Sequence, residues 1–254
     1  MTGLLRSELR KLTSGRAVVV LTFFALVLTA AQASFGLFSD FSGPFTGSER
    51  QLADAVAAVG GATVIALVVG ILSMTTEFRH RTIGRTFQLD ASRTRVLVAK
   101  LAVAVLYALM LVGLALAVVA AMAAVALARA GVDATWGPDV TRALWQAPVG
   151  YSLNAMLGVA IGALLRSQVV ALTLSLVWLF IGETLVFFLA PSVARYLPFT
   201  ALEALFADSS GDQMAVDMGL GFVPLEPGAA LGVFLAYVTV ACVAAGVRMT
   251  RGDV

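Results

Sequence analysis

The densest group of side chains able to do chemistry lies in residues 75–87, where one carboxylate, one histidine and three arginines follow closely on one another. The segment reads Thr-Thr-Glu-Phe-Arg-His-Arg-Thr-Ile-Gly-Arg-Thr-Phe. His80 is the only histidine of the sequence and Cys242 the only cysteine, so we expect neither a metal site nor a Ser–His–Asp triad here. The sequence also contains no Gly-x-x-x-x-Gly-Lys-Ser/Thr loop for nucleotide phosphates. A helix that ends in charges can dock onto another molecule by ion pairs, and this is the role that we consider for the segment below.

A second candidate site centres on Glu183, which lies inside a long apolar stretch. A carboxylate in a bilayer costs a few kcal/mol on insertion scales, so it should face protein or water, or be protonated. It could pair with Arg195 or with a partner subunit, border a substrate cavity, or carry a proton. Tyr151, Ser152 and Asn154 are polar residues in another apolar stretch. We expect them to line, together with Glu183, a vestibule on the outer side of the membrane.

Six long apolar runs must position these residues. Each holds about twenty residues, which at ~1.5 Å per residue is enough to cross the ~30 Å hydrocarbon core of a bilayer. With 60% hydrophobic and 13% charged residues over 254 positions, the sequence leaves little room for a soluble domain. We expect an all-α, polytopic membrane protein with one domain, 1–254, and six transmembrane helices. The runs are Ala17–Phe38, Ala55–Thr75, Leu101–Leu127, Ala147–Leu165, Val169–Ala190 and Ala229–Val247.

The charges between the runs differ in sign from one side to the other. If the amino terminus is cytoplasmic, 13 of the 17 Lys and Arg residues lie inside and 10 of the 15 Asp and Glu residues outside. Membrane insertion selects such a basic excess on the cytoplasmic side. We therefore expect a multi-pass protein of the inner (plasma) membrane with both termini in the cytoplasm. This orientation explains the basic loops without a nucleic-acid partner.

The segments outside the runs have their own patterns. In residues 3–15, leucines alternate with Arg6, Arg10 and Lys11, which is typical of an amphipathic helix on the membrane surface with its basic residues near lipid phosphates. A plain positively charged flank is the alternative. An Ala-x-Ala sequence at 31–33 resembles a signal-peptidase site, but the apolar run continues past it, so we expect a retained first span.

Two further segments are expected on the outer side. Residues 39–54 are predicted to be a polar loop, and residues 191–227 a short apolar helix in or on the outer leaflet, followed by an acidic loop. Glycines spaced four apart at 158 and 162 and at 228 and 232 fit either packing within one subunit or dimerisation.

The region after the second run resembles the membrane subunits of type-two ATP-binding-cassette exporters. In that family a Glu-aromatic-basic-x-x-Thr-Ile pattern ends the second span, and a helical elbow, a Ser-Arg pair and a lysine that opens the third span follow. This sequence matches with Glu77-Phe78-Arg79, Thr82-Ile83, Ser92-Arg93 and Lys100. The order of amphipathic start, six spans and large outer loop before the last span is also similar. Arg81 is a departure, because family members often carry Gly there.

The resemblance implies a function. Residues 77–87 would form a coupling helix in a cleft of a separate ATPase subunit; the contact residues would be Glu77, Phe78, Arg79, His80, Arg81, Thr82, Ile83 and Arg85. The protein would be a permease that works as a dimer, with ATP and Mg on the partner ATPase and no catalytic residue, metal or cofactor of its own. The alternative for this segment is a solvated loop whose arginines only set the topology.

Other functions fit the sequence less well. A proton-coupled secondary transporter could use Glu183, but the sequence shows no inverted repeats and no interrupted spans. A sensor or scaffold is disfavoured by the lack of a sizeable soluble domain. A membrane enzyme is disfavoured because no pair of titratable groups is placed to share one site. The apolar spans do not distinguish drug, peptide, lipid and polysaccharide cargo.

Overall fold

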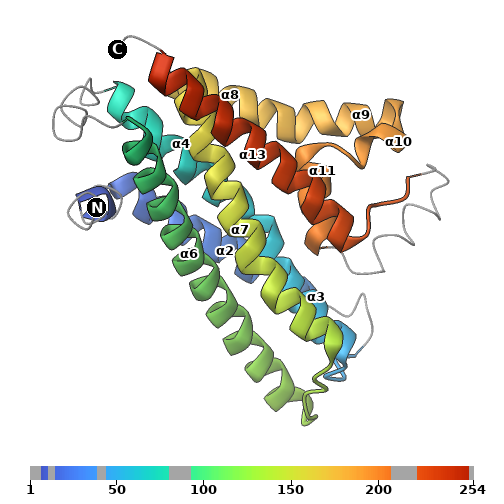
Figure 1. The fold of residues 1–254 in the computed structure, drawn as a ribbon. Helices are drawn as coiled ribbons and strands as arrows, with labels where there is room; N and C mark the ends of the chain where they lie inside the picture. The colour runs from blue at the N-terminus through green and yellow to red at the C-terminus, as the bar shows by residue number, and fades with distance from the viewer. Residues whose placement is uncertain (1–6, 11–14, 39–43, 80–92, 207–221, 252–254) are drawn as a thin grey trace.

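The computed structural model describes residues 7–10, 15–38, 44–79, 93–206 and 222–251, and the regular elements in these ranges are all helical (Figure 1). The elements are α2 (Arg16–Phe38), α3 (Glu49–Ala57), the 3-10 segment η2 (Ala58–Ala62), α4 (Thr63–Arg79), α6 (Arg93–Ala130), α7 (Pro138–Leu165), α8 (Gln168–Val177), the π-helical segment η3 (Trp178–Gly182), α9 (Glu183–Leu189), α10 (Pro191–Ala194), α11 (Pro198–Phe206) and α13 (Pro227–Arg251).

The described residues contain six helical stretches that are long and apolar enough to cross a membrane, so the predicted all-helical, six-span class is confirmed. The spans cover Arg16–Phe38, Glu49–Arg79, Thr94–Ala130, Pro138–Leu165, Gln168–Leu189 and Pro227–Arg251.

The second, third and fourth spans begin several residues earlier than hydropathy indicates, the third at Thr94 in place of Leu101. The second begins at Glu49, because the Ser48 side chain accepts a hydrogen bond from the Gln51 amide and caps the helix. The fourth begins at Pro138, which occupies the first helical turn, where a missing N–H costs nothing. The predicted polar loop 39–54 is therefore wrong from Glu49 onward.

The two ends of the bundle differ in charge. α4 and α7 finish beside the start of α8 and the end of α13: Arg79 Nη1 donates to Gln168 Oε1 at 3.4 Å, and Arg166 Nη2 donates to the Arg248 carbonyl at 3.1 Å. We call this the basic end, defined by Arg79, Arg166 and Arg248. The opposite end, where α7 begins, is called the Pro138 end (Figure 1).

α4 and α7 form the centre of the bundle and are its most buried spans, whereas α2, α8–α9 and α13 are the most exposed. Gly158 and Gly162 of α7 face α4, and a Cβ at Gly158 would collide with the Leu67 carbonyl oxygen. Small residues thus let the two backbones approach closely within one chain. At Gly228 and Gly232 a Cβ would meet no atom within 4 Å.

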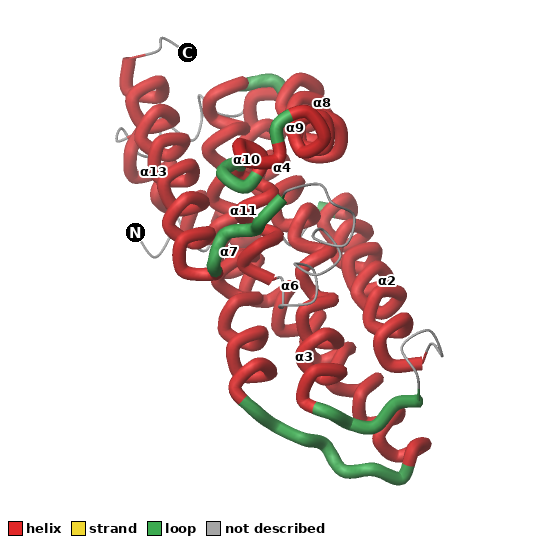
Figure 2. The backbone as a smooth tube through the Cα atoms, turned by 90° about the vertical axis from the view of Figure 1, so that its right-hand side faces the viewer, coloured by secondary structure: helices red, strands yellow, loops and turns green. Residues whose placement is uncertain are grey.

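The short helix expected in residues 191–227 is α11, and it packs against protein. Its Phe199, Leu202 and Leu205 are buried, and its neighbours are α13 and α7. In Figure 2, α10 and α11 lie in front of α7. The acidic part of the predicted loop falls largely in residues 207–221, outside the described residues.

Two spans contain a turn of different helical geometry. The second span has the 3-10 segment η2 between α3 and α4, and the fifth has the π-helical segment η3 between α8 and α9. Both segments are still helical, so neither span is unwound. The two spans nevertheless change helical geometry along their length, which the apolar runs do not indicate. Both segments border the cavity described below, and π-helical turns are frequent at functional sites.

Candidate functional site

A buried cluster of three charges lies at the basic end. Lys100 Nζ donates to Glu8 Oε2 at 2.7 Å, to Glu77 Oε1 at 3.0 Å and to the Ser73 carbonyl at 3.1 Å. All three charged residues are buried. Each ion loses much of its hydration in such a place, and the mutual attraction and the extra hydrogen bond offset that cost.

This cluster, Glu8–Glu77–Lys100, ties together three parts of the chain that are far apart in sequence. Glu8 belongs to the helical residues 7–10, Glu77 lies in the last turn of α4, and Lys100 lies in the second turn of α6. α4 and α6 flank residues 80–92, so the cluster joins both helices that lead into that segment to the amino-terminal segment. The sequence shows Lys100 as the only charge in the stretch 96–128, which could have marked it as paired.

The residues predicted to contact an ATPase divide into three groups. Glu77 is buried against Lys100, and Phe78 is half-buried, with the Arg166 guanidinium 5.8 Å from its ring centroid. Arg79 is exposed, so it can reach another molecule. The remaining predicted contacts lie outside the described residues; they are His80, Arg81, Thr82, Ile83 and Arg85.

The amino-terminal segment is described only in part. Arg10 is exposed, whereas Arg6 and Lys11 lie outside the described residues. Glu8, on the same helical turn, points inward to Lys100. The segment is therefore held to the bundle through Glu8, a link that the amphipathic pattern does not reveal.

Glu183 caps the amino terminus of α11. Its Oε1 accepts a hydrogen bond from the Phe199 amide at 2.9 Å, and its Oε2 accepts from the Thr200 amide at 2.6 Å and the Thr200 hydroxyl at 2.8 Å. The interpretation that it pairs with Arg195 is not what the structure shows, because that guanidinium lies over the Tyr196 ring, 4.8 Å from its centroid.

The capping contact has a clear physical cause. The first amides of a helix lack partners within the helix, and the helix dipole adds positive potential there. Leu197, which precedes α11, has no side-chain acceptor to satisfy them. The buried carboxylate of Glu183, from the start of α9, supplies both acceptor and negative charge. Glu183 thus fixes α11 to the fifth span.

Tyr151 and Asn154 bind the backbone around η2. Tyr151 donates its hydroxyl to the Val59 carbonyl at 2.8 Å, and Asn154 Nδ2 donates to the Thr63 carbonyl at 3.0 Å. In the 3-10 geometry the Thr63 amide bonds to the Gly60 carbonyl, so the Val59 carbonyl does not receive the α-helical bond from Thr63. These two residues therefore support the irregular turn.

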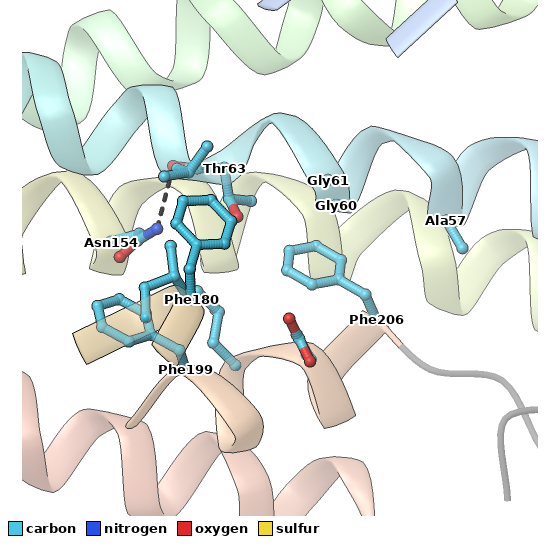
Figure 3. Close-up of a pocket in the computed structure, with 12 residues that line it drawn as sticks. Ala57, Gly60, Gly61, Thr63, Asn154, Phe180, Phe199 and Phe206 are labelled. Atoms are coloured by element: carbon cyan, nitrogen blue, oxygen red, sulfur yellow. Dashed lines mark hydrogen bonds between the residues drawn. The ribbon is translucent and has the colours of Figure 1, made fainter. Parts of the chain in front are cut away.

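A cavity of about 350 Å³ lies between this turn, α7, η3 and α11. Figure 3 shows Phe180, Phe199 and Phe206 around it, with Asn154 bonded to the Thr63 backbone. Of the polar residues predicted to form a vestibule, Asn154 lines this cavity, whereas Tyr151, Ser152 and Glu183 do not. The full lining is Ala57, Gly60, Gly61, Thr63, Val64, Asn154, Leu179, Phe180, Phe199, Leu202, Glu203 and Phe206.

Glu203 of α11 lines both this cavity and a second one, and sequence reasoning missed it. The second cavity, about 300 Å³, shares Leu179, Phe199 and Glu203 with the first and also reaches Glu183. Desolvation by the surrounding helices raises the pKa of the Glu203 carboxyl, and the Glu183 charge raises it further. The acid in an otherwise apolar segment, 198–206, was the available signal.

Comparison with known proteins gives no relative: the chain matches no protein-family model and no curated protein.

Proposed function

We propose that this protein is the permease subunit of an ATP-binding-cassette exporter in the inner (plasma) membrane. ATP and Mg would bind a separate ATPase subunit, which would dock on the basic end. The observation that carries the proposal is the Glu8–Glu77–Lys100 cluster. It joins the ends of α4 and α6 so that a displacement of residues 77–92 moves both helices and the amino-terminal segment together.

The positions of the predicted contact residues refine this proposal. Arg79 is exposed and is suited to meet acidic or carbonyl groups of an ATPase. Glu77 would not contact the ATPase itself, because it is buried and paired with Lys100. Phe78 packs partly against the core and so links a docked surface to the bundle. The resemblance to the coupling helix of the exporter family assigns residues 80–87 to the same docking surface.

We place the basic end in the cytoplasm. α4, α7 and α13 end on that side and α6 begins there (Figure 1). The residues at or beside these helix ends include Arg79, Arg95, Arg166, Arg248 and Arg251, and positive charge is retained on the cytoplasmic side during insertion. Both termini would then be cytoplasmic. Arg10 would face the phosphates of the membrane lipids.

The proposal includes a second permease copy. α4 and α7 bury their surfaces within this chain, whereas α2, α8–α9 and α13 present many exposed apolar side chains. Lipid covers part of that surface in a membrane. A six-helix subunit is small to enclose a path for cargo, so we propose that two copies form the path between them.

The test is affinity purification of the tagged protein from its native membrane in a mild detergent. We expect an ATP-binding polypeptide to co-purify and the complex to hydrolyse ATP, while the permease alone does not. Purification without such a subunit, together with uptake driven by a pH gradient in vesicles, would contradict the proposal. It would favour the proton-coupled alternative, against which the engagement of Glu183 by three donors now stands.

A further inference from the structure

The lining of the cavity beside Glu203 has an acidic side chain and no basic one, which favours one class of ligand. Its described lining has one ionisable side chain, Glu203, and no lysine, arginine or histidine. Asn154 is 1% exposed, and its Oδ1 accepts no hydrogen bond from the residues that the structure describes. The wall thus offers a negative charge and acceptors to a ligand, with no opposing cation.

The rest of the wall is aromatic and aliphatic. Phe180, Phe199 and Phe206 line the first cavity (Figure 3), and Phe187 and Phe222, whose ring centroids are 4.9 Å apart, line the second. The faces of aromatic rings attract cations, most strongly where water is excluded. A carboxylate between two ring-lined cavities is therefore suited to an organic cation with apolar groups.

The charge of the neighbouring sequence favours the same ligand. Residues 207–225, which follow α11, include three acidic residues and no lysine or arginine. A segment of one sign raises the local concentration of ions of the opposite sign.

We propose that this cavity binds hydrophobic organic cations, with Glu203 as the counter-charge and the phenylalanine rings as the walls. The two neighbouring cavities, of about 350 and 300 Å³, lie in the size range of small-molecule sites. Glu203 borders both cavities, so its carboxylate can face a cation bound in either one. The inference relies on the proposed function only in regarding this ligand as cargo.

The experiment uses two probes of nearly equal size and opposite charge, tetraphenylphosphonium and tetraphenylborate. Binding of each to the purified full-length protein is measured by calorimetry, without ATPase and without ATP. We expect Glu203→Gln to weaken binding of the phosphonium about tenfold and to leave binding of the borate unchanged or tighter. Glu226→Gln, an exposed acid outside both cavities, is the matched control and should change neither affinity.

A second variant protects the test against a folding defect. Phe180 is 64% exposed in this chain, so Phe180→Leu keeps an apolar side chain and removes a ring face with little effect on packing. We expect it to weaken phosphonium binding about two- to fivefold. Equal affinities of the wild type and both variants for the phosphonium, or equal losses for both probes, would overturn the inference. Because no ATPase is present in this experiment, neither result bears on the proposed coupling to an ATPase, which is tested separately by co-purification.

Discussion

At the scale of single residues, Lys100 is the most informative side chain. It lies between the carboxylates of Glu8 and Glu77, and all three are buried. The sequence marks Lys100 as an interruption of an apolar stretch, but its partner Glu8 is 92 residues away. Periodicity and hydropathy report on neighbours along a helix, so the pairing could not be predicted from them.

Removing the cation from this cluster should be costly. Lys100→Met leaves two carboxylates buried near each other, and breaking a buried ion pair in this way costs about 3–5 kcal/mol. We expect a clear fall in the thermal unfolding temperature of the detergent-solubilised protein. Arg95→Met is the control, because Arg95 is an exposed residue of the same helix. Equal unfolding temperatures for the two variants would show that the cluster contributes little.

At the scale of elements, α11 depends on a residue of another helix. Glu183 was recognisable from the sequence as a buried charge, but its role was not, because the amides it caps belong to a segment that hydropathy leaves between two spans. The start of the second span was missed for a similar reason. Arg50 and Asp54 lower the hydropathy of that turn, although its Leu52 and Ala53 are buried.

Loss of the cap should loosen α11 locally. Glu183→Leu removes both acceptors and should cost about 1–2 kcal/mol, so the amides of Phe199 and Thr200 should exchange hydrogen faster. Hydrogen-exchange mass spectrometry of α11 measures this. Adding Leu197→Ser to the same variant supplies a local capping hydroxyl and should restore part of the protection. Unchanged exchange in Glu183→Leu would mean that α11 is held by its apolar contacts alone.

The contact between α4 and α7 can be tested with one added methyl group. Gly158→Ala places a Cβ against the Leu67 carbonyl, so one backbone must shift, at a cost of about 1–3 kcal/mol. The thermal unfolding temperature should fall. Gly232→Ala, where a Cβ meets no atom within 4 Å, should leave that temperature equal or higher. A larger fall for Gly232→Ala would show that α13 packs on a second copy at that glycine.

At the scale of the whole molecule, the bundle has a tightly packed centre, exposed outer spans, and two differently built ends. The basic end has the buried ion cluster and exposed arginines, whereas α11 and the two cavities lie near η2 and η3. We propose that force enters at the first site and that cargo binds at the second. The six spans came directly from hydropathy, whereas both sites required contacts between distant segments.

Docking on the basic end can be tested through its exposed arginine. Arg79→Glu reverses the charge of a side chain proposed to meet the ATPase, and should weaken the affinity between the two subunits about tenfold or more. Titration of the co-purifying ATPase onto immobilised permease measures that affinity. Arg50→Glu, an exposed arginine of α3, should leave it unchanged. The same loss for both variants would indicate a general effect of charge and would remove Arg79 from the interface.

Site-specific photo-crosslinking in native membranes is the most direct test of the central claim, which is that a separate ATPase binds the segment after α4. A photoreactive phenylalanine analogue replaces Arg79 at the basic end or Trp136, which is 66% exposed near the Pro138 end. We predict that an ATP-binding polypeptide is crosslinked from position 79 and not from position 136. Crosslinking of that polypeptide from position 136 alone would contradict the account.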